Sequence, residues 1–399
     1  MRKFFFHDPK LLIYGFLIIF FASYGQTFFI SLFNAEIRNF YKLTDGEFGL
    51  IYALGTLSSS LILIGFAKLI DYIDLRIYSF LISIGLTFSC LGLYISYNSP
   101  IFLFFILFGL RFFGQGAMSH AGETTMARYF GKNRGKAISV STFGGMTGVM
   151  ILPIIVVNLL YIFGWQEVWL ISSLSILVFF SPIIFFTLRN QKTRHLNFTR
   201  SLNDKSIQKK LRTRDVAKNK KFFVYLPISV ATPFISTGLT FHQIFIIDQK
   251  GWTLQMLSQG FIFLGFFSIV GAIFGGPIID KYNTSKVIIF TLIPLFFAIL
   301  TLIFFESNFS MFLYMSLLGL NLGISIPFIG SLWAELFDLE SLGTVKALLH
   351  ACSVFFSALS PLVFGYMIDF GLGIYSLSLL SLFIIIISTF LTFFYIKAE

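Results

Sequence analysis

Long apolar segments alternate with short polar stretches along the whole chain. A helix needs roughly 20 apolar residues to cross a bilayer, because it rises about 1.5 Å per residue through a core about 30 Å thick. The segments therefore predict about twelve membrane-spanning helices. Their expected bounds are 11–33, 47–70, 77–96, 100–122, 137–162, 166–188, 222–247, 256–279, 287–305, 309–333, 345–368 and 374–396.

The composition favours an all-α integral membrane protein. Of the 399 residues, 56% are hydrophobic and 12% are charged, and the mean hydropathy is +0.86. Soluble domains carry about 25% charged residues, and a water-soluble fold could not hide this much apolar side chain. Cys90 and Cys352 both fall in apolar segments, so they indicate neither a disulfide framework nor a metal site.

The net charge of +11 is concentrated in one part of the chain. Of the 29 Lys and Arg residues, 12 lie between Arg189 and Lys221, which is typical of a cytoplasmic loop and argues against a nucleic-acid-binding surface. If both termini are cytoplasmic, the outward loops hold only Arg38, Lys42 and Lys250. By the positive-inside rule, we expect both termini in the cytoplasm and the protein in the inner or plasma membrane.

The two halves of the chain resemble each other at a nearly constant offset, between 209 and 213 residues. Six helices per half is an even number, so the halves are expected to be parallel six-helix repeats with the substrate near the midplane between them. The expected domains are a bundle over 1–188, a basic linker over 189–221 that is flexible or lies on anionic headgroups, and a bundle over 222–399. The matched positions are Gly25 with Gly238, Leu54 with Leu264, Asp71 with Asp280, Gly109 with Gly319, and Lys136 with Lys346.

Two loops in equivalent positions resemble the signature loop of the major facilitator superfamily. The second copy reads Gly276-Pro277-Ile278-Ile279-Asp280-Lys281, and the first runs from Ala67 through Asp71 to Arg76. The resemblance implies twelve helices and a latch that closes the cytoplasmic gate, in which an aspartate meets the positive end of a facing helix. The latch residues expected from it are Asp71, Arg76, Asp280, Lys281 and Lys346.

Two further stretches carry a narrower resemblance. Leu110 to Gly116 is similar to the arginine-bearing motif of the superfamily's fourth helix. Arg128 to Ala137, leading to Gly144, resembles the start of the fifth helix in monocarboxylate and oxalate/formate carriers. This second resemblance implies a small carboxylate as substrate.

Arg111 is the leading candidate for a substrate-binding residue. It lies about eleven residues into a helix that starts near Pro100, so its depth is about 16 Å, near the middle of the bilayer core. An unpaired cation there costs about 3 kcal/mol or more, and no carboxylate is expected at the same depth. Arg111 is therefore available to bind an anion, and a carboxylate could contact it in bidentate fashion. The alternative is that it binds carbonyls and hydroxyls between helices.

Other polar residues of the spans complete the expected binding site. Gln115 and Ser119 follow Arg111 at helical spacing, so they are expected on the same face. The resemblance implies that helices 1, 4, 7 and 10 line the cavity, although an isolated Ser or Thr in a membrane helix usually bonds its own backbone. The remaining candidates are Tyr24, Gln26, Thr27, Ser236, Thr240, Gln243, Asn321, Ser353 and Ser357.

Three residues are candidates for coupling transport to protons, namely His350, His120 and Glu123. Histidine titrates in the physiological range, and His350 begins a polar stripe with Ser353 and Ser357. His242 is expected on the outward side near Asp248. For each histidine the alternative is a hydrogen-bonded packing role.

These features predict a secondary transporter that works by alternating access on a small organic anion, with proton coupling or exchange. The second hypothesis is a proton-linked exporter of hydrophobic or aromatic compounds, suggested by the 55 phenylalanines. An enzyme would need paired carboxylates, a Ser/His pair or metal-ligand spacing within the membrane, and none is evident. The sequence has no nucleotide-binding motif. We expect no metal or other cofactor, contacts with membrane lipids, and a monomer.

Overall fold

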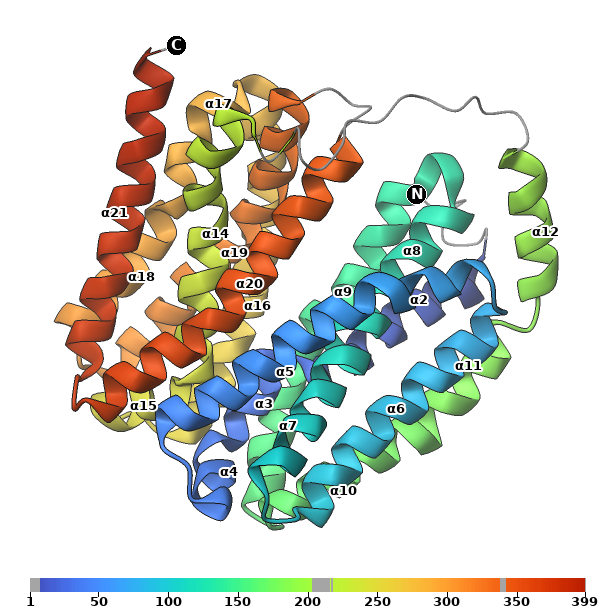
Figure 1. The fold of residues 1–399 in the computed structure, drawn as a ribbon, viewed down its shortest axis with the longest axis horizontal. Helices are drawn as coiled ribbons and strands as arrows, with labels where there is room; N and C mark the ends of the chain where they lie inside the picture. The colour runs from blue at the N-terminus through green and yellow to red at the C-terminus, as the bar shows by residue number, and fades with distance from the viewer. Residues whose placement is uncertain (1–7, 203–215, 217, 338–341, 399) are drawn as a thin grey trace. The chain divides into compact units, whose positions relative to one another are not determined.

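The computed structural model describes residues 8–202, 216, 218–337 and 342–398, and within these ranges the regular elements are all helices, without a strand (Figure 1). Eleven helices are long and apolar enough to cross a membrane. A further pair, Pro9–Gly25 and Thr27–Tyr41, passes the same test together and brings the number to twelve if it is one span. The prediction of an all-α membrane protein is confirmed.

The chain divides by its internal contacts into two compact units. The first unit comprises Met1–Lys42 and Ile51–Ser206, and the second comprises Leu43–Leu50 and Ile207–Glu399. Helix α5, Asp45–Phe66, therefore begins in the second unit and belongs to the first from Ile51 onward.

The first unit is built from short helical segments that follow one another with little loop. Besides α5, its elements are α2 (Pro9–Ala22), η1 (Ser23–Gly25), α3 (Thr27–Ile30), η2 (Ser31–Phe33), α4 (Asn34–Tyr41), η3 (Ala67–Asp71), α6 (Leu75–Ile95), α7 (Pro100–Gly109), η4 (Leu110–Met118), α8 (Ser119–Tyr129), η5 (Gly131–Asn133), α9 (Arg134–Leu160), α10 (Trp165–Ser175), η6 (Ile176–Phe180), α11 (Ser181–Thr187) and α12 (Gln191–Leu202). Helix α2 packs on α9, and α6 packs on α10.

The second unit has longer, less interrupted helices. They are α14 (Lys220–Phe241), α15 (Gln243–Lys250), α16 (Leu254–Lys281), α17 (Thr284–Val287), η7 (Ile288–Leu292), α18 (Ile293–Phe304), α19 (Asn308–Leu336), α20 (Leu342–Asp369) and α21 (Ile374–Ala398). Helix α16 packs along α19, and α14 packs on α20. A side chain on Gly319 would place its Cβ 2.2 Å from the Leu264 carbonyl oxygen, so α19 and α16 can approach this closely only through glycine.

The predicted helix starts have ordinary capping chemistry. Asp8 precedes Pro9 and accepts a hydrogen bond from the Leu11 amide. Thr253 accepts from the Met256 amide at the start of α16. Such caps satisfy amides that have no partner within the helix, and proline fits the first helical position because it lacks the amide hydrogen.

Two expectations about the continuity of spans are wrong, and the linker is described only in part. The first expected span, 11–33, is broken at Gln26, where the two helical parts meet at 47°. The seventh, expected over 222–247, ends as α14 at Phe241, and a separate α15 follows after His242. The basic linker, expected to be flexible or to lie on anionic headgroups, begins with the helix α12, and Arg194 in that helix pairs with Asp8 at 2.6 Å. Residues 203–215 and 217 of the linker lie outside the described residues.

Candidate functional site

The break in the first helix releases a backbone carbonyl inside the first unit. Gln26 has extended backbone angles, with φ −83° and ψ 153°. In a continuous α-helix the Phe29 amide would bond to the Gly25 carbonyl, but here it donates to the Gln26 carbonyl at 3.2 Å. The Gly25 carbonyl is therefore free to accept a hydrogen bond from elsewhere in the unit.

A second irregular segment lies against this break. Residues Leu110–Met118 form the π-helix η4 within the fourth membrane helix, and π-helical segments are often found at functional sites. A Cβ on Gly25 would stand 2.0 Å from the Leu110 carbonyl oxygen and 2.8 Å from the Gly114 Cα. Glycine at position 25 is therefore what allows η4 to touch the break, and it brings Arg111 beside the released carbonyl.

The Arg111 guanidinium donates hydrogen bonds to neutral oxygens from two other helices. Nη1 donates to the Gly25 carbonyl at 3.0 Å and to the Thr27 hydroxyl at 3.5 Å, and Nε donates to the Thr56 hydroxyl at 3.1 Å. The guanidinium carbon lies 5.1 Å from the centre of the Tyr52 ring, a cation–π contact. The Tyr52 hydroxyl in turn shares a hydrogen bond of 2.7 Å with Thr27. The result is a polar cluster within the first unit.

This cluster holds a buried positive charge without an acid. Arg111 is 2% exposed, and it forms no ion pair with any carboxylate in the described parts of the chain. Nη2 makes no hydrogen bond within the same residues, whereas Nε and Nη1 both do. Hydrogen bonds from Arg111 to a carbonyl and to hydroxyls of other helices are the alternative to anion binding that the sequence also allowed. They leave the donors of Nη2 without a hydrogen bond among the described residues.

Gln115 and Ser119 do not share the surroundings of Arg111. Both side chains are half-buried, whereas the guanidinium is enclosed. The π-helix η4 closes its hydrogen bonds over five residues, which at four positions still returns close to the same face. The expectation that these two residues lie on the Arg111 face therefore stays a prediction.

The other candidates from the first helix have different environments. Thr27 belongs to the Arg111 cluster, and Gln26 is half-buried at the break. The Tyr24 hydroxyl bonds to Ser175 in α10 at 2.8 Å, and its ring packs against Phe21 and Phe29. Tyr24 therefore ties the first helix to α10 and does not join the cluster.

Asn321, the repeat partner of Arg111, is fully buried in the second unit. Its Nδ2 donates to the Thr291 carbonyl of η7 at 2.9 Å, and its Oδ1 has no hydrogen-bond partner in the part of the chain that the structure describes. The side chain therefore bridges α19 to η7. It is a tether between helices in this conformation, with no exposed edge for a ligand.

The remaining candidates of the second unit are dispersed. Thr240 and Gln243 line a cavity of about 10 Å³ together with Trp252 and Tyr314, which is room for about one water. Ser357 donates to the Val354 carbonyl at 3.0 Å, within its own helix. The half-buried side chains with no role yet assigned are Ser236 and Ser353.

The titratable candidates also lie apart. His120 is half-buried and bonds to Thr124 one turn along α8. Glu123 and His350 are exposed at the surfaces of their units. His242 was expected on the outward side near Asp248, and the structure places its Nδ1 3.4 Å from Asp45 at the start of α5. The described residues contain no cluster of three or more His, Cys, Asp or Glu side chains suited to a metal ion.

The loop after the second helix forms an ion pair that the sequence reading did not identify. Asp71 pairs with Arg128 at the end of α8, and Arg128 also donates to the Ile70 carbonyl at 3.3 Å. Arg76 pairs with Asp74 at 2.9 Å, and the hydrogen bond from Arg76 lowers the pKa of the Asp74 carboxyl. Asp74 therefore caps α6, and the ion pairs of the described residues join Arg76 to Asp74 and Asp71 to Arg128.

The equivalent loop of the second unit uses another carboxylate. Glu335 at the end of α19 accepts hydrogen bonds from the Thr284 amide at 2.7 Å and the Ser285 hydroxyl at 2.8 Å. Lys281 stacks on the Tyr282 ring at 5.3 Å, and Lys346 is exposed. The side chain of Asp280 lies outside the described residues. The start of α17 is thus held by Glu335, which the motif did not indicate.

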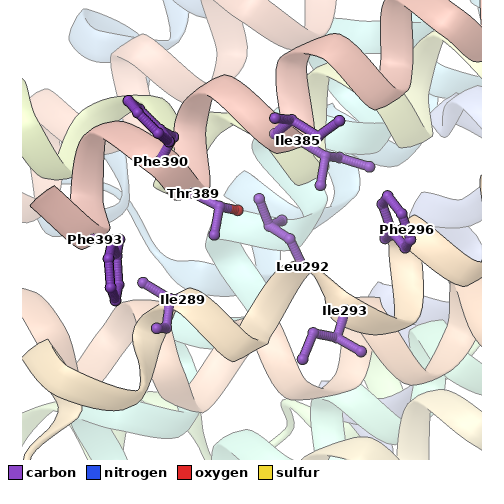
Figure 2. Close-up of a pocket in the computed structure, with 9 residues that line it drawn as sticks. Ile289, Leu292, Ile293, Phe296, Ile385, Thr389, Phe390 and Phe393 are labelled. Atoms are coloured by element: carbon purple, nitrogen blue, oxygen red, sulfur yellow. The ribbon is translucent and has the colours of Figure 1, made fainter.

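A larger cavity, of about 370 Å³, lies in the second unit between α21 and the segment η7–α18 (Figure 2). Its lining is apolar except for Thr389, and several of its side chains, such as Ile386 and Phe390, are exposed. An apolar groove on the outer side of a membrane helix suits a lipid chain. None of the predicted site residues reaches it.

Comparison with known proteins agrees with this architecture. Residues 15–293 match the family model of the Major Facilitator Superfamily. The structure is similar to that of a bacterial homologue of the human lysosomal transporter Spinster, with a TM-score of 0.72 at 14% identity over 97% of this chain and 96% of the other. It is also similar to the nucleoside transporter NupG, with a TM-score of 0.71 at 13% identity over 98% of both chains.

No curated protein matches the sequence significantly. The family match covers more than half of the chain, and the likeness to the solved structures extends over its whole length. The chain therefore belongs to the Major Facilitator Superfamily, as a multi-pass membrane transporter and not an enzyme.

Proposed function

We propose that this transporter carries a small organic anion, a carboxylate, and that Arg111 is its electrostatic anchor. The observation that supports this most directly is a guanidinium that is 2% exposed and has no carboxylate partner among the described residues. A cation in such surroundings is costly unless neutral oxygens or a ligand balance it. Gly25, Thr27 and Thr56 supply the neutral oxygens, and the anion would supply the missing charge.

The geometry of the cluster suits a carboxylate better than a neutral ligand. The oxygens that bind Nε and Nη1 fix the plane of the guanidinium, so Nη2 points in one direction. A charge-assisted hydrogen bond to an ionised oxygen is roughly twice as strong as a neutral one. Since the site is closed in this conformation, the anion gains access when the first unit opens during alternating access.

We propose that the anion gradient or a proton gradient drives transport. His350, His120 and Glu123 stay candidates for proton coupling, and His120 is bonded to Thr124 within α8. The topology that goes with this proposal has both termini in the cytoplasm of the inner or plasma membrane. The working unit would be a monomer whose domains are 1–188 and 222–399, joined by the linker 189–221.

The alternative is a proton-linked exporter of hydrophobic or aromatic compounds. The apolar cavity of about 370 Å³ would favour it if the cavity lay on a route for substrate (Figure 2). Its lining comes from η7, α18 and α21 and carries no charged group, so it gives no means of coupling to a proton. We therefore favour the anion.

Uptake into proteoliposomes tests this proposal. The purified protein would be offered labelled mono- and dicarboxylates, a nucleoside as the neutral comparison suggested by NupG, and a hydrophobic cation, each with and without a pH gradient. We expect saturable uptake of a carboxylate and none of the nucleoside. Uptake of the nucleoside or the hydrophobic cation in place of every carboxylate would contradict the proposal.

A variant series locates the anchor. Arg111→Lys keeps the charge but loses the planar fork, so we expect the KM for the carboxylate to rise by at least tenfold in a folded protein. Arg38→Gln is the matched control, since Arg38 lies in α4 and donates to Asn34 at 2.7 Å, away from the cluster. An unchanged KM in Arg111→Lys would remove the anchor role from Arg111.

A further inference from the structure

The apolar groove of the second unit runs along α21 and the segment η7–α18. Figure 2 shows Ile289 beside Phe393 at one end, and Phe296 and Ile385 at the other. The lining residues differ in exposure, because Ile385 is buried whereas Phe390 is exposed. The groove, of about 370 Å³, is therefore open along its side and closed at its base.

The length of this groove matches the depth of one bilayer leaflet. Ile385 and Phe393 are eight residues apart on α21, which is about 12 Å along the helix axis. Half of a hydrocarbon core about 30 Å thick is about 15 Å. Ile385 lies near the middle of α21 and Phe393 lies close to its end, so the groove extends from near the membrane surface toward the midplane. One acyl chain of a single leaflet fits this depth.

Two lysines flank the surface end of the groove. Lys397 follows Phe393 by one helical turn, and Lys286 precedes Ile289 by one turn, so each lysine is on the same side of its helix as a lining residue. Both lysines are exposed, and within the described residues neither ammonium forms a hydrogen bond or an ion pair. Two cations therefore stand at the open end of an apolar groove without a counter-ion from the described residues.

The other charged groups at this end of the second unit add to the positive charge or have partners. Lys220, at the start of α14, places its Nζ 5.8 Å from the centre of the Tyr395 ring of α21. The carboxylate of Glu335 accepts hydrogen bonds from the Thr284 amide at 2.7 Å and the Ser285 hydroxyl at 2.8 Å. The surface end of the groove is thus basic, and an anionic group there would be attracted to it.

We propose that this groove binds an anionic phospholipid, with one acyl chain between α21 and η7–α18 and the phosphate between Lys286 and Lys397. The apolar lining takes the chain, and the two ammonium groups donate charge-assisted hydrogen bonds to the phosphate oxygens. The bound lipid would join α21 to α18 along the side where the groove separates them. The inference does not depend on the substrate proposed above, because it uses no residue of the Arg111 cluster.

The size and charge of the site favour this occupant over others. A segment of a second helix about 10 Å wide and about 12 Å long would occupy roughly 900 Å³, which exceeds the groove volume of about 370 Å³. A hydrophobic compound would fill the groove but would leave the lysines without an anion. A zwitterionic phospholipid brings its own cation, whereas an anionic phospholipid leaves its phosphate to the lysines.

Photo-crosslinking of the full-length protein in phosphatidylcholine nanodiscs tests the site. A trace of phosphatidylglycerol or of phosphatidylcholine, each with the same diazirine-bearing acyl chain, would be added, and labelled peptides would be measured by mass spectrometry. Labelling of 385–393 would be divided by labelling of α9, where Ile151 and Ile155 are exposed. We expect this ratio to be about tenfold higher for phosphatidylglycerol, because two lysines act on one phosphate. Equal ratios for the two lipids, or no labelling of 385–393, would overturn the proposal.

A double variant and a matched control make the test specific to the two lysines. Lys286→Gln combined with Lys397→Gln should bring the ratios for the two lipids within twofold of each other. Lys136→Gln combined with Lys192→Gln removes the same charge from exposed positions of the first unit and should keep the wild-type preference. A preference that survives in the first pair, or that is lost equally in both pairs, would show that these lysines do not form the site.

Competition separates a membrane lipid from a soluble phosphate. Glycerophosphoglycerol has the headgroup and phosphate of phosphatidylglycerol but no acyl chain. In excess it should leave the labelling of 385–393 unchanged, because the chain supplies the apolar part of the binding. Loss of labelling would mean that the lysines bind a soluble phosphate compound, and it would contradict a lipid site.

Discussion

Arg111 in the first unit and Asn321 in the second stand at matching points of the internal repeat, 210 residues apart. Each is buried, and each donates to a backbone carbonyl of another segment, Gly25 in one case and Thr291 in the other. The first unit reaches its carbonyl through a broken helix and a π-helix, whereas the second uses a regular α-helix against η7. The same position thus holds a charge in one repeat and a neutral tether in the other. The two copies of the repeat therefore share a buried side chain that donates to a backbone carbonyl, and only the first copy places a charge there.

The largest expected effect comes from making the first unit resemble the second. Arg111→Asn removes the charge while leaving a side chain able to donate to the Gly25 carbonyl. We expect the initial rate of carboxylate uptake to fall about 100-fold, the equivalent of about 2.7 kcal/mol. Uptake into proteoliposomes at equal reconstituted protein measures it. Uptake within twofold of wild type would mean that the charge difference between the repeats has no role in transport.

Removing the Thr56 hydroxyl should have the next largest effect. Thr56→Val deletes the acceptor of Nε without changing the charge, leaving a buried N–H unpaired at a cost of about 1–3 kcal/mol. Since this hydroxyl orients the guanidinium, we expect a lower melting temperature and a several-fold rise in KM. Thr87→Val, at a buried hydroxyl that bonds within its own helix, is the control. A KM equal to that of the control would contradict an orienting role.

In the second unit the corresponding change should cost less. Asn321→Leu removes one hydrogen bond to Thr291 but also removes a buried Oδ1 that has no partner among the described residues. The two terms oppose each other, so we expect a change in unfolding free energy within about 1 kcal/mol. Thermal unfolding in detergent measures it. Destabilisation as large as that of Thr56→Val would show that both repeats depend equally on this position.

The capping carboxylates extend the comparison to the loops. Glu335→Ala removes an acceptor that holds the start of α17, and a cap of this kind contributes about 1 kcal/mol. We expect faster hydrogen exchange at 284–287 and no change at 75–78, where Asp74 caps the equivalent helix of the first unit. Faster exchange at both places would indicate a global loss of stability in place of a lost cap.

The smallest effect should be a pH dependence at Asp74. The hydrogen bond from Arg76 lowers the pKa of this carboxyl below its usual value of 3.8, so the ionised form is favoured in the folded state. The stabilisation is therefore present above pH 3.8 and is lost as pH falls through the lowered pKa. Since the pair is partly exposed, the contribution is about 0.5 kcal/mol. Acid unfolding of Asp74→Asn should differ from wild type near pH 5 and converge with it near pH 2.

Most of the fold follows from apolar segment length, because a bilayer sets the length of a spanning helix. Several predicted spans begin and end within a few residues of the observed helices, as at 77–96 for Leu75–Ile95 and 374–396 for Ile374–Ala398, whereas the span 100–122 ends seven residues before its helix does at Tyr129. The breaks at Gln26 and His242 could not be predicted in this way. Neither is proline nor glycine, and each break depends on contacts with other helices.

The candidate site shows the same limit. The depth of Arg111 is a matter of counting residues from Pro100, and the guanidinium is indeed buried. The acceptors of its hydrogen bonds could not be predicted from the sequence, because the Gly25 carbonyl is free only where the first helix breaks. The pairs Asp71–Arg128 and Asp45–His242 join residues far apart in sequence and depend on the packing of whole helices. In the sequence, Arg128 can be recognised only as a charged residue near the end of a helix. That position does not specify Asp71 as its partner.

Among the described residues no acid pairs with Arg111, and this has a consequence for the response of the transporter to voltage. The empty site carries one positive charge within the membrane, where a potential of 100 mV acts on each elementary charge with about 2.3 kcal/mol. On the proposed function, a bound monovalent carboxylate cancels that charge. The membrane potential would then bias the return of the empty carrier and leave the loaded carrier unaffected, so exchange of two monovalent anions would proceed without electrical current.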